Sequence, residues 1–161
     1  MEHIADLVTT LARELKARSL MMATAESCTG GLIAGACTDL SGSSDWFERG
    51  FVTYSNAAKH ELLGVPVALI EQHGAVSEPV ARAMASGALA HSPSQLAVAV
   101  TGVAGPTGGS ADKPVGTVWF ALASADGTVA RHVAWTGTRD EIRGRAVNVA
   151  LDMARRHLAR R

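Results

Sequence analysis

The sequence has little of what several common classes of protein require. Aromatic residues make up only 4% of the 161 residues, so the core must be built mainly from Ala, Val, Leu and Met. The formal net charge is zero, which argues against a nucleic-acid binder, because such a protein needs a basic face to neutralise phosphates. No apolar run approaches the length of a membrane span, and the acidic, amphipathic N-terminus lacks the pattern of a secretory signal. We therefore expect a cytoplasmic protein with no membrane or nucleic-acid partner.

Cysteine is scarce as well. Cys28 and Cys37 lack metal-ligand spacing and have no obvious Cys or His partners, so we expect reduced thiols and no metal site. Apolar residues make up 47% of the chain, enough for one full core at this length. We expect residues 1–161 to form a single domain.

The spacing of apolar residues predicts alternating helices and strands. The expected helices cover residues 2–18, 31–40 and 56–63, then start at 78 and 139, and the expected strands cover 20–25, 51–54, 96–100, 116–124 and 129–135. Thr138 and Glu141 form a capping box for the last helix. Asp126-Gly127 signals a hairpin, so the pattern indicates a layered α/β fold with a mixed sheet.

Ligand sites in such sheets gather at the carboxyl ends of parallel strands. Two glycine-rich segments follow expected strands, one after Ala25 and one after Val100. In the first, Ser27 lies where a strand turns into a helix, a placement that suits an exposed nucleophile beside free N–H groups. The plainer interpretation is that Ser27 or Thr29 caps the helix, and this segment alone favours capping.

The segment from Tyr54 to Lys59 is the second cluster. Ser55 or Asn56 can cap a short helix, which places Lys59 in its first turn. A helix N-terminus disfavours the charged form of a lysine, and a neutral lysine is a competent base for a serine. Taken alone, an ordinary surface lysine explains Lys59 as well.

Two further features suit an anion. The segment 101–109 is rich in glycine, and its amides can face a phosphate, although it matches neither a P-loop nor a dinucleotide fingerprint. Arg139 and Arg143 share one face at the start of the last helix, where the helix dipole disfavours cations unless an anion binds. A flexible loop, and pairing of the arginines with Asp140 or a neighbouring acid, are the alternatives.

Together these segments resemble the C-terminal domain of the CinA family, in order and over essentially the whole chain. The matching motifs are Ala25–Gly31, Gly42–Ser44, Val52–Lys59, Gly74–Ser77, Thr101–Pro106 and Pro114–Val118. The resemblance implies a three-layer α/β/α sandwich with a mixed, mostly parallel sheet. It covers only the C-terminal domain of full-length CinA proteins, which carry a further N-terminal domain.

The resemblance also implies an activity, the deamidation of nicotinamide mononucleotide to nicotinic acid mononucleotide and ammonia, without a metal or organic cofactor. It assigns the nucleophile to Ser27 and the base to Lys59, with Tyr54 as a further catalytic residue. Substrate contacts are expected from Thr29, Gly30, Gly31, Ser43, Ser44, Thr101, Gly102, Ala104, Gly105, Arg143 and, less favoured, Arg139.

Two other functions fit the same residues. A nucleotide-binding or interaction module without catalysis would keep the glycine-rich loop and the arginines, and an amidase for another small carboxamide would keep the serine and the lysine. The expected partner is a small nucleotide substrate. The low net charge and an Ala-rich surface allow a homodimer, and relatives in the resembled family tend to self-associate.

Overall fold

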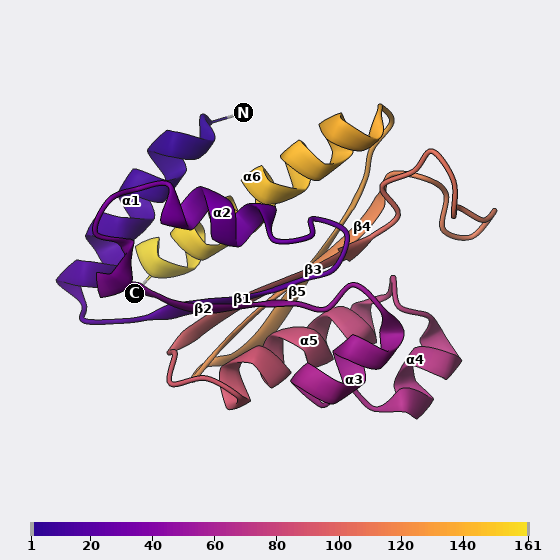
Figure 1. Ribbon diagram of the computed structural model, residues 1–161, viewed down its shortest axis with the longest axis horizontal. Coiled ribbons are helices and arrows are strands. Elements are labelled where there is room, and N and C mark those ends of the chain that lie inside the picture. Colours follow the sequence, from indigo (N-terminus) through magenta and orange to yellow (C-terminus); the bar gives the residue numbers. More distant parts are fainter. Residues whose placement is uncertain (1, 161) are drawn as a thin grey trace.

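Helices and strands alternate along most of the chain, as the apolar pattern predicts. The computed structural model describes residues 2–160 (Figure 1). The helices are α1 (Ile4–Ala17), α2 (Leu32–Thr38), α3 (Asn56–Leu63), α4 (Val67–His73), α5 (Glu78–Ala90) and α6 (Arg139–Ala159), with a 3-10 turn η1 (Ser43–Asp45). The strands are β1 (Met22–Glu26), β2 (Phe47–Val52), β3 (Leu96–Gly102), β4 (Thr117–Ser124) and β5 (Gly127–Ala134).

The five strands form one mixed sheet in the order β2-β1-β3-β4-β5. β1 pairs in parallel with both β2 and β3, whereas the β3–β4 and β4–β5 pairs are antiparallel. The expected mostly parallel sheet is therefore found only in part: two of the four pairs are antiparallel, although β4 alone runs against the other strands. β1 and β3 are neighbours, so their carboxyl ends meet at one edge of the sheet.

Helices cover both faces of this sheet, with α1, α2 and α6 on one side and α3, α4 and α5 on the other (Figure 1). The strands offer each side a different set of residues. Large side chains such as Val98, Phe120 and Leu122 pack toward α1 and α6. The opposite face is lined by alanines, and these pack against α5 and its neighbours: Ala23, Ala25, Ala97, Ala99, Ala121 and Ala123. A chain with few aromatics thus fills its core by close approach of helix and sheet.

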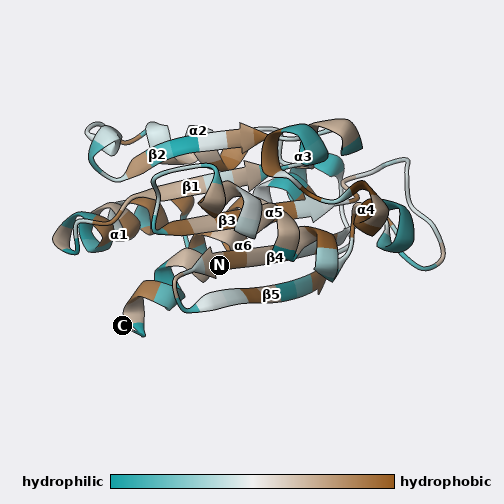
Figure 2. Ribbon diagram, turned by 90° about the horizontal axis from the view of Figure 1, so that it is seen from below, coloured by the Kyte–Doolittle hydropathy of each residue, from teal (hydrophilic) through white to brown (hydrophobic). Residues whose placement is uncertain are grey.

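The edge strands are more polar than the centre, as Figure 2 shows by the hydrophilic segments on β2 and β5. The three central strands are almost wholly buried. No helix within residues 2–160 is long and apolar enough to cross a bilayer.

Two elements differ from the expected ones. β2 begins at Phe47, four residues before the expected strand, because its exposed polar residues hide the strand pattern. Helix α4 was not expected, and Pro66 stands at its N-cap. Ser77 occupies the N-cap of α5, where its hydroxyl donates to the Gly74 carbonyl at 2.8 Å and does not cap the helix.

Two helical glycines provide a matched test of the packing on the alanine face. A Cβ on Gly87 of α5 would lie 2.0 Å from the Leu63 carbonyl oxygen of α3, whereas a Cβ on Gly144 of α6 would meet nothing within 4 Å. Gly144→Ala should raise the free energy of unfolding by about 0.5–1 kcal/mol through helix propensity. Gly87→Ala should lower it by about 1–3 kcal/mol through overpacking. Denaturant unfolding measures both, and equal stabilisation by the two substitutions would contradict the close α3–α5 contact.

Candidate active site

A sharp turn joins the carboxyl end of β1 to α2, and we call residues Ser27–Gly31 the nucleophile turn, after the role that the sequence predicts for Ser27. The Ser27 N–H donates to the Val100 carbonyl of β3 at 3.0 Å, which ties the turn to the neighbouring strand. Gly30 and Gly31 have φ values of 57° and 105°, a left-handed conformation that glycine adopts without strain. The chain can therefore leave β1 and enter α2 within a few residues, and Ser27 stands at the bend.

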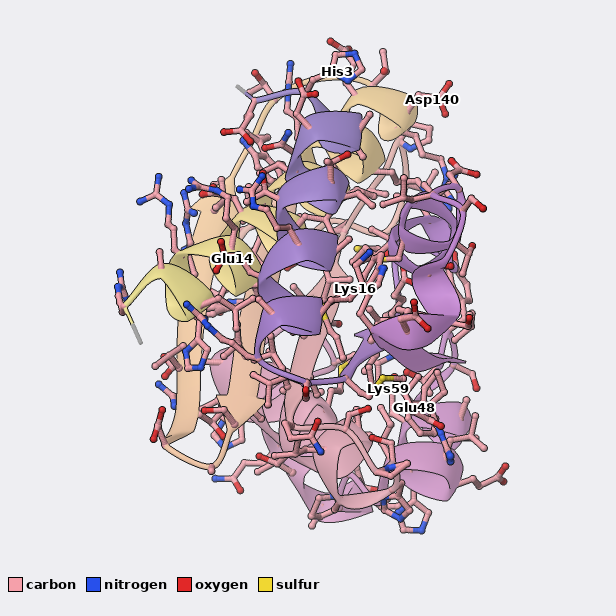
Figure 3. The ribbon with its side chains drawn as sticks, turned by 90° about the vertical axis from the view of Figure 1, so that its left-hand side faces the viewer. His3, Glu14, Lys16, Glu48, Lys59 and Asp140 are labelled. Atoms are coloured by element: carbon pink, nitrogen blue, oxygen red, sulfur yellow. The ribbon has the colours of Figure 1, made fainter. Side chains whose placement is uncertain are left out.

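Lys59 meets this turn from the opposite side. It lies in the first turn of α3, where the Ser55 hydroxyl accepts from the Ala58 N–H at 3.0 Å and caps the helix as predicted. Its side chain is only 1% exposed. Figure 3 shows Lys59 away from the edge of the molecule, whereas His3 and Asp140 lie at the edge in the same view. The Lys59 Nζ is 3.0 Å from the Ser27 Oγ. The structure thus brings together the two residues expected to act as nucleophile and base.

The hydrogen bonds of Lys59 suit a neutral amine. Its Nζ donates to the carbonyl oxygens of Thr53 and Tyr54, at 3.0 and 3.1 Å. A neutral amine has two N–H groups for these carbonyls and one lone pair, which can accept the Ser27 hydroxyl proton. Burial removes water from the ammonium and lowers the pKa of Lys59, while the nearby Cys28 raises it by a smaller amount.

A pocket of about 240 Å³ opens over these two groups. Its walls come from the nucleophile turn, α3, the segment before α5, the end of β3 and the start of α6. The lining residues are Ser27, Cys28, Tyr54, Asn56, Lys59, Ala75, Val76, Thr101, Gly102, Ala104 and Arg139. The Thr101 hydroxyl donates to the Ala75 carbonyl at 2.9 Å and so fixes one wall. This is the carboxyl edge of β1 and β3, where the sequence placed the site.

The two arginines of α6 have separate surroundings. Arg139 lines the pocket, where it donates to the Gly105 carbonyl at 2.7 Å and lies 3.4 Å from the Tyr54 hydroxyl. Arg143, the favoured phosphate ligand, is directed elsewhere: its guanidinium donates to the carbonyl oxygens of Cys28 and Thr29, at 3.1 and 3.4 Å. Of the two arginines, Arg139 is the one that lines the pocket, and Arg143 lies against the nucleophile turn.

Other expected residues lie outside the pocket. Ser43 and Ser44 belong to η1, which precedes β2, and the start of β2 pairs with the start of β1. They lie at the amino edge of the sheet, one strand length from Ser27, so within this chain they cannot reach the site. The N–H of Gly30 donates to the Ser27 carbonyl at 3.0 Å and is not free for an oxyanion.

Tyr54 contributes to the site in a different way from that expected. Its carbonyl oxygen accepts from Lys59, whereas its side chain is 62% exposed and its hydroxyl faces Arg139. Gly105, also expected in the site, enters only through the carbonyl that holds Arg139. The phenol thus belongs to the mouth of the pocket.

Sequence reasoning missed several residues of the site. Asn56, Ala75 and Val76 line the pocket, and all three lie within motifs that carry the family resemblance. Glu26 was missed as well: its carboxylate, 1% exposed, accepts hydrogen bonds from the turn and from α2. Among residues 2–160, no group of three or more His, Cys, Asp or Glu side chains is placed to hold a metal ion.

Comparison with known proteins places this architecture in a family. Residues 4–158 match the model of the CinA C-terminal domain, and the chain belongs to that family. It is 52% identical over 156 residues to the nicotinamide-nucleotide amidohydrolase PncC of Enterobacter agglomerans, covering 96% of this chain and 95% of the relative. With the protein of the same name from Escherichia coli (strain K12) it shares 54% identity over 142 residues, covering 88% and 86%.

A solved structure agrees with these relatives. The competence/damage inducible protein CihA from Agrobacterium tumefaciens superposes with a TM-score of 0.92 at 46% identity, covering 95% of this chain and 96% of that one. The agreement extends over both layers of helices and the whole sheet, because nearly every residue of each chain is included.

Cys28, the neighbour of Ser27, is a rival nucleophile that the structure allows to be tested. Burial raises the pKa of its thiol from 9.0 to about 11, so the thiol stays protonated at every pH below that value. We expect iodoacetamide at pH 8 to alkylate Cys28 at least about a hundredfold more slowly in the native protein than in the unfolded chain. Peptide mass spectrometry reports the rate. Rapid alkylation of the native protein would indicate a thiolate and make Cys28 a competitor.

Proposed function

We propose that this chain is a nicotinamide-nucleotide amidohydrolase, which converts nicotinamide mononucleotide and water to nicotinic acid mononucleotide and ammonia. The observation that carries the proposal is the 3.0 Å contact between the Ser27 hydroxyl and the buried Lys59 amine at the floor of a pocket. Relatives that share more than half of their residues with this chain bear the name of that activity.

In the proposed first half-reaction, the Ser27 Oγ attacks the carboxamide carbon while its proton passes to the Lys59 Nζ. The tetrahedral intermediate then collapses. The C–N bond breaks, Lys59 returns the proton to the leaving nitrogen, and ammonia departs from an ester on Ser27. Lys59 is again neutral and ready for the second half.

In the second half-reaction, Lys59 takes a proton from water and the hydroxide attacks the ester carbon. The C–O bond to Ser27 breaks, the proton returns to the Ser27 oxygen, and the product leaves as a carboxylic acid that releases its own proton to water. One amine thus serves both steps as base and acid.

The negative charge of each intermediate needs N–H donors. The N–H groups of Cys28 and Thr29 are the best candidates, because within residues 2–160 neither donates a hydrogen bond to another residue. Thr29 is fully buried, and a buried N–H without a partner is uncommon unless a ligand completes it. We assign the oxyanion to these two groups and not to Gly30, whose N–H donates to the Ser27 carbonyl.

The substrate phosphate would bind Arg139. Its side chain lines the pocket and has no carboxylate partner among the ion pairs of residues 2–160. The Tyr54 hydroxyl lies beside it at the mouth, where it can donate to the same phosphate. The carboxamide would then lie deep in the pocket and the phosphate near its opening.

Two substitutions test the nucleophile and the base. Ser27→Ala removes the attacking oxygen, and Lys59→Met keeps the length of the side chain but removes the amine. Each should lower ammonia release from nicotinamide mononucleotide on the order of 10³-fold or more, with the circular dichroism spectrum unchanged. Near-normal turnover by Ser27→Ala would show that the nucleophile is misassigned. Binding of the nucleotide by the wild-type protein without ammonia release would favour a binding module instead.

The pH dependence tests the protonation state of Lys59. The lowered pKa means that the amine loses its proton below its usual value of 10.5, and only the neutral amine can accept the Ser27 proton. We expect kcat/KM to fall as pH drops through the lowered pKa, with a slope of about one decade per pH unit, and to level off above it. A profile that keeps rising up to pH 10.5 would mean that burial does not shift this lysine.

A further inference from the structure

The Arg143 side chain of α6 holds the nucleophile turn through hydrogen bonds to two carbonyl groups of that turn. The Nε donates to the Cys28 oxygen at 3.1 Å and the Nη2 to the Thr29 oxygen at 3.4 Å. A Cβ on Gly30 would lie 3.4 Å from the same Nη2, so the guanidinium rests directly against the turn. No acidic residue forms an ion pair with Arg143 among residues 2–160, and these carbonyls are its hydrogen-bond acceptors there.

Glu26 holds the same turn from the other end. Its Oε1 accepts from the Thr29 hydroxyl at 2.6 Å and the Ile33 N–H at 2.9 Å, and its Oε2 accepts from the Ala34 N–H at 2.9 Å. The N-cap residue of α2 is Gly31, which has no side chain to do this. Glu26 therefore satisfies the N–H groups of Ile33 and Ala34, the second and third residues of α2, and ties them to the end of β1.

These contacts fix the direction of the N–H groups in the turn. In a trans peptide the C=O and the N–H of the same unit point in opposite directions. The unit that carries the Cys28 carbonyl also carries the Thr29 N–H, so Arg143 orients the N–H that we assign to the oxyanion. The next unit carries the Thr29 carbonyl and the Gly30 N–H, which donates to the Ser27 carbonyl.

We propose that Glu26 and Arg143 are positioning residues, which hold Ser27 and its oxyanion donors in the reactive geometry and do not contact the phosphate. The inference rests on the proposed function, whose nucleophile and oxyanion donors it supports. It differs from the sequence expectation, in which Arg143 binds the substrate. The two roles predict opposite kinetic effects, because loss of a phosphate ligand weakens binding, whereas loss of a positioning contact slows the chemical step.

The test uses Arg143→Gln and Arg143→Lys, with Glu26→Gln as a second variant, on two substrates. Nicotinamide mononucleotide reports kcat and KM, and p-nitrophenyl acetate, which lacks a phosphate, reports acylation of Ser27 after subtraction of the Ser27→Ala background. We expect Arg143→Gln to lower kcat on the order of a hundredfold with KM within about twofold, and to slow p-nitrophenolate release by a similar factor. Glu26→Gln should act in the same way, and Arg143→Lys should recover part of the loss.

Two arginines of the same helix serve as controls. Arg145 donates to the Thr136 carbonyl at 2.8 Å and pairs with Glu141, away from the turn, so Arg145→Gln should keep both activities. Arg139→Gln should raise KM for the nucleotide by a larger factor than it slows p-nitrophenolate release, because the ester has no phosphate.

The outcomes separate the two proposals. If Arg143→Gln raises KM for the nucleotide and keeps the ester reaction, Arg143 binds phosphate and the positioning role is wrong, while the proposed function stands. If the wild-type protein releases no ammonia but the ester reaction responds to Arg143 as expected, the proposed substrate is wrong and the positioning role stands. If Glu26→Gln fails to fold, the Arg143 variants still decide.

Discussion

The contact between the Ser27 hydroxyl and the buried Lys59 amine is the interaction on which the rest of the site depends. A lysine that is 1% exposed is costly to keep charged, and no carboxylate is among its hydrogen-bond partners in residues 2–160. The amine avoids this cost when it is neutral. A neutral amine can donate to the two carbonyl oxygens beside it and accept from the Ser27 hydroxyl. The proposed base and the proposed nucleophile beside it follow from the same arrangement.

The fold brings these groups together through the order of its strands. β1 and β3 are far apart in sequence yet pair directly, so the turn after β1 and the segment after β3 form opposite walls of one pocket. β2 and the capped start of α3 carry Lys59 to the same edge. Small alanines on one face of the sheet let α5 lie close to the strands, and Gly87 lets α3 lie close to α5. Ser27 is therefore held by a turn that is bonded to β3, and Lys59 by a capped helix.

Much of this could be predicted from the sequence, where the signals are local. The Ser55 cap, the position of Lys59 in a first helical turn, the strand-to-helix bend at Ser27 and the capping box of α6 are all found as expected. Each depends on residues within about four positions of one another. Apart from the start of β2 and helix α4, the expectations that differ from the structure depend on longer distances. Ser43 and Ser44 were placed in the site by resemblance, but the direction of β2 puts them at the opposite edge of the sheet.

Arg139 and Arg143 show where the sequence alone stops. Their spacing determined that they share a helix face, and the capping box determined where that helix begins. Four residues correspond to about 6 Å along a helix axis, so Arg139 lines the pocket while Arg143 lies against the Cys28 and Thr29 carbonyl groups. Only the angle at which α6 crosses the sheet decides which arginine faces the pocket, and that angle is set by packing against α1 and the strands. The sequence by itself determined the residues and their local conformation; the tertiary structure decided their partners, because these are set by contacts between segments distant in the chain.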